Sequence, residues 1–144
     1  MAKVLIVDDE PDIVMLLRLA LQADGYTTVE AFDGVEALEM IESRHPDLVL
    51  LDVMMPVMDG WTTLEQLGER GEHPKVIVVT AKTTTRDQDR ALKLGADDFV
   101  TKPFEPEELL RRMRAVMGRE RGGEGRPDDQ ALPPLSSPFT RPPA

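Results

Sequence analysis

Three short, uninterrupted runs of apolar residues constrain the fold of this chain more than any other feature of its sequence. They are residues 4–7 (VLIV), 48–51 (LVLL) and 76–79 (VIVV). A strand with one face in water alternates apolar and polar residues, whereas a strand of a parallel sheet is covered on both faces and stays apolar. These runs predict the interior strands of a parallel sheet, with residues 27–32 and 99–101 as weaker strands toward its edges.

Segments with helical periodicity lie between the predicted strands. In the clearest of them, apolar residues recur at helical spacing before Gly25, namely Ile13, Leu16, Leu17, Ala20 and Leu21. Further helices are predicted over residues 34–44, about 59–70, 84–94 and 106–117. Five strands alternating with five helices predict an α/β fold, a doubly wound parallel sheet with right-handed crossovers and helices on both faces.

Composition narrows the class of protein. The chain has 144 residues, of which 41% are hydrophobic and 31% charged, as in a soluble globular domain. No apolar run is long enough to span a bilayer or to form a secretory signal, so we expect a cytoplasmic protein without membrane contact. The chain has no cysteine and only two histidines, His45 and His73, so a bound metal needs oxygen ligands.

The chain is strongly acidic, and residues 118–144 differ in composition from the rest. The net charge is −10, which argues against direct DNA binding because a polyanion repels another polyanion. Residues 118–144 contain six of the twelve prolines and four of the ten glycines, and few large apolar side chains. We therefore expect one domain over residues 1–117 and a disordered Pro/Gly-rich tail over 118–144, with no output domain.

Reactive side chains follow four of the predicted strands. Asp8 and Asp9 follow the first, Asp52 the third, Thr80 the fourth and Lys102 the fifth. The carboxyl ends of parallel strands meet at one edge of the sheet, where ligands bind in such folds. Two carboxylates about 4 Å apart repel by roughly 4 kcal/mol at an effective dielectric of about 20, so the cluster requires positive charge. Lys102 and a divalent cation can supply it, and an oxygen-only site suits Mg²⁺.

A carboxylate beside Mg²⁺, a lysine and a hydroxyl can attack a phosphoryl group. Asp52 is the predicted nucleophile because it ends the central strand, and an aspartyl phosphate would be the product. Lys102 and the metal would neutralise the phosphoryl oxygens, and Thr80 would donate a hydrogen bond to one of them. Taken singly, these residues have simpler interpretations: Asp8 or Asp9 as a helix cap, Thr80 as a turn hydroxyl and Lys102 as a solvated lysine.

Four separated motifs carry a resemblance to a known family. They are VDDEP at residues 7–11, LLDVMMPVMDG at 50–60, VVTA at 78–81 and GADDFVTKPF at 95–104. In order and spacing, residues 2–117 resemble the receiver domain of bacterial two-component response regulators. The resemblance implies a flavodoxin-like sheet with strand order 2-1-3-4-5. Because no output domain is expected, we predict a stand-alone regulator, which is a diffusible chemotaxis-like signal, a relay intermediate that passes the phosphoryl group onward, or an allosteric regulator of another protein.

The resemblance also implies the roles of individual residues. Asp52 would take a phosphoryl group from the phosphohistidine of a sensor histidine kinase or a phosphotransfer protein. Mg²⁺ would bind Asp9, Asp52 and the Met54 backbone carbonyl directly, and Asp8 through a water. Lys102 would pair with the phosphate, and the peptide bond before Pro103 is expected to be cis. Thr80 and Phe99 would form a switch pair that changes the surface of the fourth helix, fifth strand and fifth helix for a downstream output protein.

Other positions carry weaker expectations. Phe99 is also well placed to be a plain core residue. Met54 and Lys82 flank the path of water to the phosphate in the family, so they are predicted to tune its lifetime. Members of the winged-helix class of regulators form homodimers through acid and arginine pairs on the surface of the fourth and fifth helices. The matching residues here are Asp97, Asp98, Glu108, Arg112 and Arg119, although Gln88 stands where that class tends to carry a basic residue, and a solvated charged face is the alternative.

Two other functions compete with this interpretation. A phosphohydrolase with an aspartyl nucleophile usually has a second acid two residues further on, and Met54 occupies that position. A nucleotide-binding protein of this fold class needs a glycine-rich phosphate loop, which the sequence lacks. We therefore predict a signalling phosphoacceptor whose only catalysis is its own phosphorylation and dephosphorylation.

Overall fold

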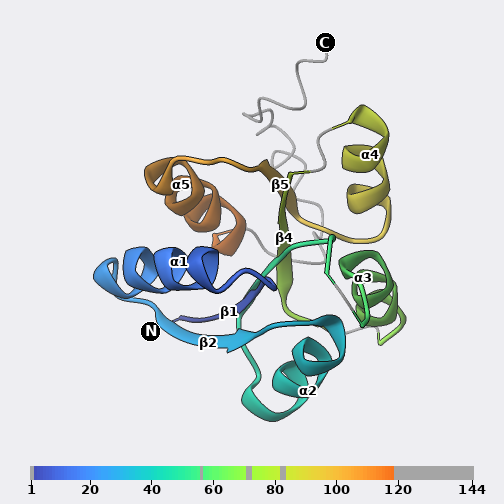
Figure 1. Ribbon diagram of the computed structural model, residues 1–144, viewed down its shortest axis with the longest axis horizontal. Helices are drawn as coiled ribbons and strands as arrows, with labels where there is room; N and C mark the ends of the chain where they lie inside the picture. Colours follow the sequence, from blue (N-terminus) through green and yellow to red (C-terminus); the bar gives the residue numbers. More distant parts are fainter. Residues whose placement is uncertain (1, 56, 71–72, 82–83, 119–144) are drawn as a thin grey trace.

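The computed structural model describes residues 2–55, 57–70, 73–81 and 84–118, which form a parallel sheet covered by helices on both faces (Figure 1). The five strands lie in the order β2-β1-β3-β4-β5, as the resemblance implied, so β3 is central. The predicted tail, apart from Gly118, lies outside the described residues. The strands are β1 (Lys3–Val7), β2 (Thr27–Ala31), β3 (Leu48–Leu51), β4 (Lys75–Thr80) and β5 (Asp98–Thr101).

Two layers of helices cover the sheet. Helices α1 and α5 lie on one face, and α2, α3 and α4 lie on the other (Figure 1). Within the described part of the chain, no helix is both long and apolar enough to cross a membrane. The helices are α1 (Pro11–Ala23), α2 (Gly34–Arg44), α3 (Gly60–Glu69), α4 (Thr85–Lys93) and α5 (Pro106–Met117).

Each central strand contributes alternate residues to two separate cores. Leu48 and Leu50 of β3 pack with α1 and α5, whereas Val49 and Leu51 pack with the α2, α3 and α4 layer. Successive side chains of a strand point to opposite faces, so a strand between two helical layers must be apolar at every position. This geometry explains the uninterrupted apolar runs of the sequence.

Most element boundaries agree with the sequence prediction. Helices α2 and α5 and strand β3 have the predicted bounds, and the other boundaries differ by at most two residues. Helix α1 begins at Pro11 instead of near Ile13, because proline is favoured in the first turn of a helix, where its missing N–H costs nothing. The N-cap is therefore Glu10, and Asp12 lies inside the first turn.

The start of α3 is packed directly against the end of β3. The backbone N–H of Gly60 donates to the carbonyl of Val53 at 3.1 Å. A Cβ atom on Gly60 would lie 2.4 Å from the carbonyl oxygen of Asp52 and 2.4 Å from the Cα atom of Val53. Only glycine allows this approach, so Gly60 fixes the distance between α3 and the backbone of Asp52.

We expect Gly60→Ala to destabilise the fold by about 2 kcal/mol, because the new methyl group meets backbone atoms that cannot move independently. Gly68→Ala in the same helix is the matched control, since its Cβ would meet only the carbonyl oxygen of Leu94, at 3.5 Å. The control should stabilise the protein by about 0.5–1 kcal/mol through helix propensity. Urea unfolding measures both, and equal effects of the two substitutions would contradict this account.

Candidate functional site

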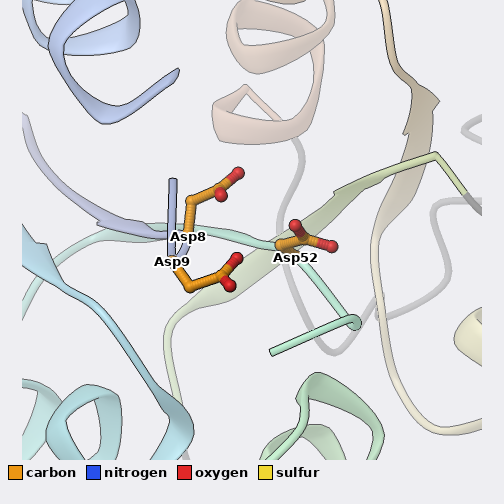
Figure 2. Close-up of side chains that lie close together, drawn as sticks. All are labelled: Asp8, Asp9 and Asp52. Atoms are coloured by element: carbon orange, nitrogen blue, oxygen red, sulfur yellow. The ribbon is translucent and has the colours of Figure 1, made fainter. Parts of the chain in front are cut away.

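Three carboxylates meet at the carboxyl-terminal edge of the sheet (Figure 2). Asp8 and Asp9 follow β1, and Asp52 follows β3, whose last residue is paired with the last residue of β1. One oxygen from each carboxylate lies within 4.8 Å of the others. Asp8 and Asp52 are 2% and 5% exposed, whereas Asp9 is exposed. The sheet therefore brings together the three acids that the sequence predicted as one cluster.

Backbone hydrogen bonds orient the two buried carboxylates. The N–H of Glu10 donates to Asp8 Oδ1, and the N–H of Met54 donates to Asp52 Oδ1, each at 3.0 Å. The backbone N–H of Asp52 also donates to the carbonyl of Val7 at 3.0 Å. Each acid is thus held by its own loop and by the neighbouring strand, with its second oxygen directed to other partners.

Lys102, which follows β5, is the partner of the second oxygen of both aspartates. Its Nζ atom donates to Asp8 Oδ2 at 2.8 Å, Asp52 Oδ2 at 3.0 Å and Glu10 Oε1 at 3.2 Å. The Lys102–Pro103 peptide bond is cis, as the resemblance implied. The sequence placed Glu10 beside the two aspartates, but its contact with Lys102 was not predicted, since this contact depends on the path of a loop far along the chain.

The electrostatics of the cluster follow from burial and from Lys102. Burial raises the pKa of Asp8 above its usual value, even though the hydrogen bond from Lys102 favours the charged carboxylate. Burial disfavours the charge of Lys102, but its hydrogen bonds to Asp8 and Asp52 outweigh this and raise the pKa of its ammonium. The lysine therefore remains protonated and offsets part of the carboxylate repulsion.

The cluster has the composition of a magnesium site. Its donors are carboxylate oxygens from Asp8, Asp9 and Asp52, and hard oxygen donors in small number are what Mg²⁺ prefers. Asp9 is the most exposed of the three, so the cluster is open to solvent on one side. Among the described residues, this is the one group of three acidic or histidine side chains whose ligand atoms converge in this way.

Thr80 and Phe99 lie on the face of the sheet that α2, α3 and α4 cover. Thr80 ends β4 and is fully buried, as is Phe99 in β5. Phe99 is paired with Val78 and belongs to the core on the α2, α3 and α4 side, as does Val78. Thr80 follows Val78 by two residues and so points to the same face. The two predicted switch residues are therefore diagonal neighbours on adjacent strands.

The residues predicted for a dimer face form contacts within the chain. Arg112 donates to both oxygens of Asp98, at 2.9 and 3.1 Å, and to Glu108 at 2.8 Å. Asp97 accepts a hydrogen bond from the backbone N–H of Val76 at 2.8 Å. Arg112 and Asp98 are buried, so this group ties α5 to β5. Arg119, also predicted for this face, and Lys82, predicted to tune lifetime, lie outside the described residues.

Comparison with known sequences identifies the family. The sequence model of the response regulator receiver domain matches residues 4–114. The response regulator MprA of Mycobacterium sp. (strain KMS) is 44% identical over 130 residues, which are 90% of this chain and 56% of that protein. The alkaline phosphatase synthesis transcriptional regulatory protein PhoP of Bacillus subtilis is 44% identical over 81% of this chain and 49% of its own length. The chain spans about half the length of these curated relatives.

Solved structures agree with this result. The receiver domain of the Francisella response regulator 1452 superposes with a TM-score of 0.78 and 35% identity, covering 81% of this chain and 97% of that one. The chemotaxis protein CheY4 of Vibrio cholerae superposes with a TM-score of 0.76 and 33% identity, covering 81% of this chain and 98% of that one. The chain belongs to the response regulator receiver domain family and is a signalling domain of a two-component system. Phosphorylation and Mg²⁺ binding are general properties of this family.

Glu108 gives a test of the contacts around Arg112. Partial burial alone would raise its pKa, but the hydrogen bonds and charges of Arg112 and Arg111 outweigh this and lower the pKa of Glu108 below 4.5. A lowered pKa means that the unfolded chain binds more protons, so this stabilisation is full above pH 4.5 and is lost as the pH falls through the folded-state value.

We expect Glu108→Gln to lower the free energy of unfolding by about 0.5–1 kcal/mol near pH 7, and by less near pH 4, because the lost ion pair is partly exposed. Urea unfolding at the two pH values measures the difference. Glu107→Gln, at an exposed position in the same helical turn, is the control and should change stability little. A loss from Glu108→Gln that is the same at both pH values would contradict the electrostatic explanation.

Proposed function

We propose that this chain accepts a phosphoryl group on Asp52 from the phosphohistidine of a sensor histidine kinase or a phosphotransfer protein. The observation that supports this most directly is the position of the Asp52 carboxylate. It is buried beside Asp8 and Asp9, and its Oδ2 atom lies 3.0 Å from the ammonium of Lys102. A carboxylate held in this way combines a nucleophilic oxygen with positive charge for a phosphoryl group.

Each residue of the site has its own role in the proposed phosphoryl transfer. An oxygen of Asp52 attacks the phosphorus as the P–N bond of the phosphohistidine breaks, and the electron pair leaves with the imidazole. The N–H of Met54 holds Asp52 Oδ1, which orients the carboxylate. Lys102 exchanges its contact with Asp52 Oδ2 for one with the phosphoryl oxygens. Mg²⁺ would be held directly by Asp9, Asp52 and the Met54 carbonyl and through a water by Asp8, and when bound it would supply further positive charge for those oxygens.

Thr80 and Phe99 are proposed to transmit phosphorylation to the α4, β5 and α5 surface. The Thr80 hydroxyl would move to the phosphoryl group, and the Phe99 ring would fill the space beside it. Their diagonal arrangement on one face supports this pairing. The ring of Phe99 is already fully buried here, so the proposal requires a second, more exposed ring position in the unphosphorylated protein.

The output of the domain is proposed to be binding of a partner protein, as for a diffusible regulator. A second candidate is the receiver half of a transcriptional regulator. It is favoured by the curated relatives, because the match covers only 56% of MprA and 49% of PhoP, and PhoP is named as a transcriptional regulatory protein. In that case DNA binding belongs to another domain, since the described domain is acidic. A homodimer through Asp98 and Arg112 would require their internal ion pair to be exchanged.

The decisive test is incubation with acetyl phosphate and Mg²⁺ followed by intact mass spectrometry. Wild-type protein should gain one phosphoryl group, and the gain should vanish when EDTA replaces Mg²⁺. Asp52→Asn removes the nucleophile while keeping the size of the side chain, so it should give no adduct. Asp12→Asn, which changes an exposed acid in α1, is the control and should react like the wild type.

Two results would overturn the assignment of Asp52. One is an adduct on Asp52→Asn equal to that of the wild type, which would place the phosphoryl group elsewhere. The other is the absence of an adduct on the wild type when a known receiver domain is labelled in parallel and beryllofluoride also fails to bind.

Met54 provides a second prediction, about the lifetime of the phosphoryl group. Met54 is 55% exposed and follows Asp52 by two residues, where an apolar group can hinder water from reaching the phosphorus. We expect Met54→Asn to accelerate hydrolysis of the aspartyl phosphate, measured as loss of the adduct after acetyl phosphate is removed. An unchanged rate would exclude this position from control of the lifetime.

A further inference from the structure

Helix α4 is attached to the domain by few apolar side chains. Ala91 is its single buried residue, and Leu94, just after the helix, is partly buried against the same core. Leu92 is 40% exposed. By contrast, α3 buries five residues and α5 buries five. A helix with so little buried apolar surface is held weakly, so a single additional contact changes its stability appreciably.

One such contact joins α4 to α3. The Cζ atom of Arg90 lies 4.2 Å from the centroid of the Trp61 ring, inside the range of a cation–π interaction. Trp61 is the only tryptophan of the chain and is 8% exposed, so its ring is fixed in the core. Arg90 covers the ring from α4, which Figure 1 shows beside α3. The exposed partner of the pair is therefore the arginine.

The other end of this connection is rigid and close to Asp52. Trp61 follows Gly60, whose N–H donates to the carbonyl of Val53 and on which a Cβ atom would lie 2.4 Å from the carbonyl oxygen of Asp52. The first turn of α3 is thus fixed on the strand end that carries Asp52. Through Trp61, this fixed turn is in direct contact with a side chain of α4.

We infer that the Arg90–Trp61 stack is a latch that holds α4 against α3 in this conformation. The latch adds to the small apolar contact of Ala91, and any movement of α4 away from α3 must break it. Arg90 therefore stabilises the conformation in which α4 lies against α3, relative to one in which α4 has moved away from α3. It does so from outside the acidic cluster. The packing of α4 against α3 by this contact does not depend on the proposed phosphorylation of Asp52.

Amide hydrogen exchange of the unphosphorylated protein, followed by mass spectrometry of α4 peptides, tests the latch. We expect Arg90→Ala to increase exchange in α4 about two- to fivefold, the effect of losing one partly exposed cation–π contact. Arg86→Ala, an exposed arginine of the same helix, is the matched control and should leave α4 exchange nearly unchanged. Exchange in the α1 and α5 layer should not change in either variant.

A double-mutant cycle separates the stack from a general effect of charge. In a Trp61→Leu background the aromatic face is absent, so Arg90→Ala should have no more effect than Arg86→Ala. Equal exchange in Arg90→Ala and Arg86→Ala, or an Arg90→Ala effect that persists in the Trp61→Leu background, would overturn the inference.

Tryptophan fluorescence gives a readout that does not depend on a variant of the core. Quenching by acrylamide should increase in Arg90→Ala, because the guanidinium no longer covers the ring, and should remain closer to the wild type in Arg90→Lys. Unchanged quenching in Arg90→Ala would also overturn the latch. These measurements use no phosphoryl donor, so a failure of the latch is distinguishable from a failure of the proposed phosphorylation.

Discussion

The repulsion among carboxylates at one edge of the sheet is the constraint on which the site depends. Asp8 and Asp52 are buried side by side, and two such charges are unfavourable unless a cation offsets them. Lys102 reaches both from the far edge strand, which requires β5 and its loop to be in place. The acids therefore depend on the complete sheet, because the cation that offsets their charge follows its last strand.

Much of this architecture could be predicted from the sequence because the underlying physics is local or periodic. The runs at residues 48–51 and 76–79 are apolar at every position because two helical layers cover the strands. Strand ends are also recognisable in the sequence, so the sequence alone predicts Asp8, Asp52 and Lys102 at one edge of the sheet. The family resemblance added the strand order and the cis peptide bond before Pro103, both of which the structure contains.

The remaining features depend on distances between elements that no local pattern specifies. The contact of Glu10 with Lys102 joins residues 92 positions apart, and it requires two loops to converge. The buried ion pair of Asp98 with Arg112 within one chain is a second such feature, and their place on a homodimer face stays a prediction. The stack of Arg90 on Trp61 follows from the angle between two helices, which sequence periodicity does not determine.

The division of the interior into two cores also has a consequence for how such a chain diverges. The apolar residues packed with α1 and α5 and those packed with α2, α3 and α4 form two sets without a common member. A change of side-chain volume in one set is accommodated within that set, because the sheet backbone lies between them. The two sides of the domain can therefore accumulate compensating substitutions independently, and a lineage can acquire a new partner on one side while the packing on the other is retained.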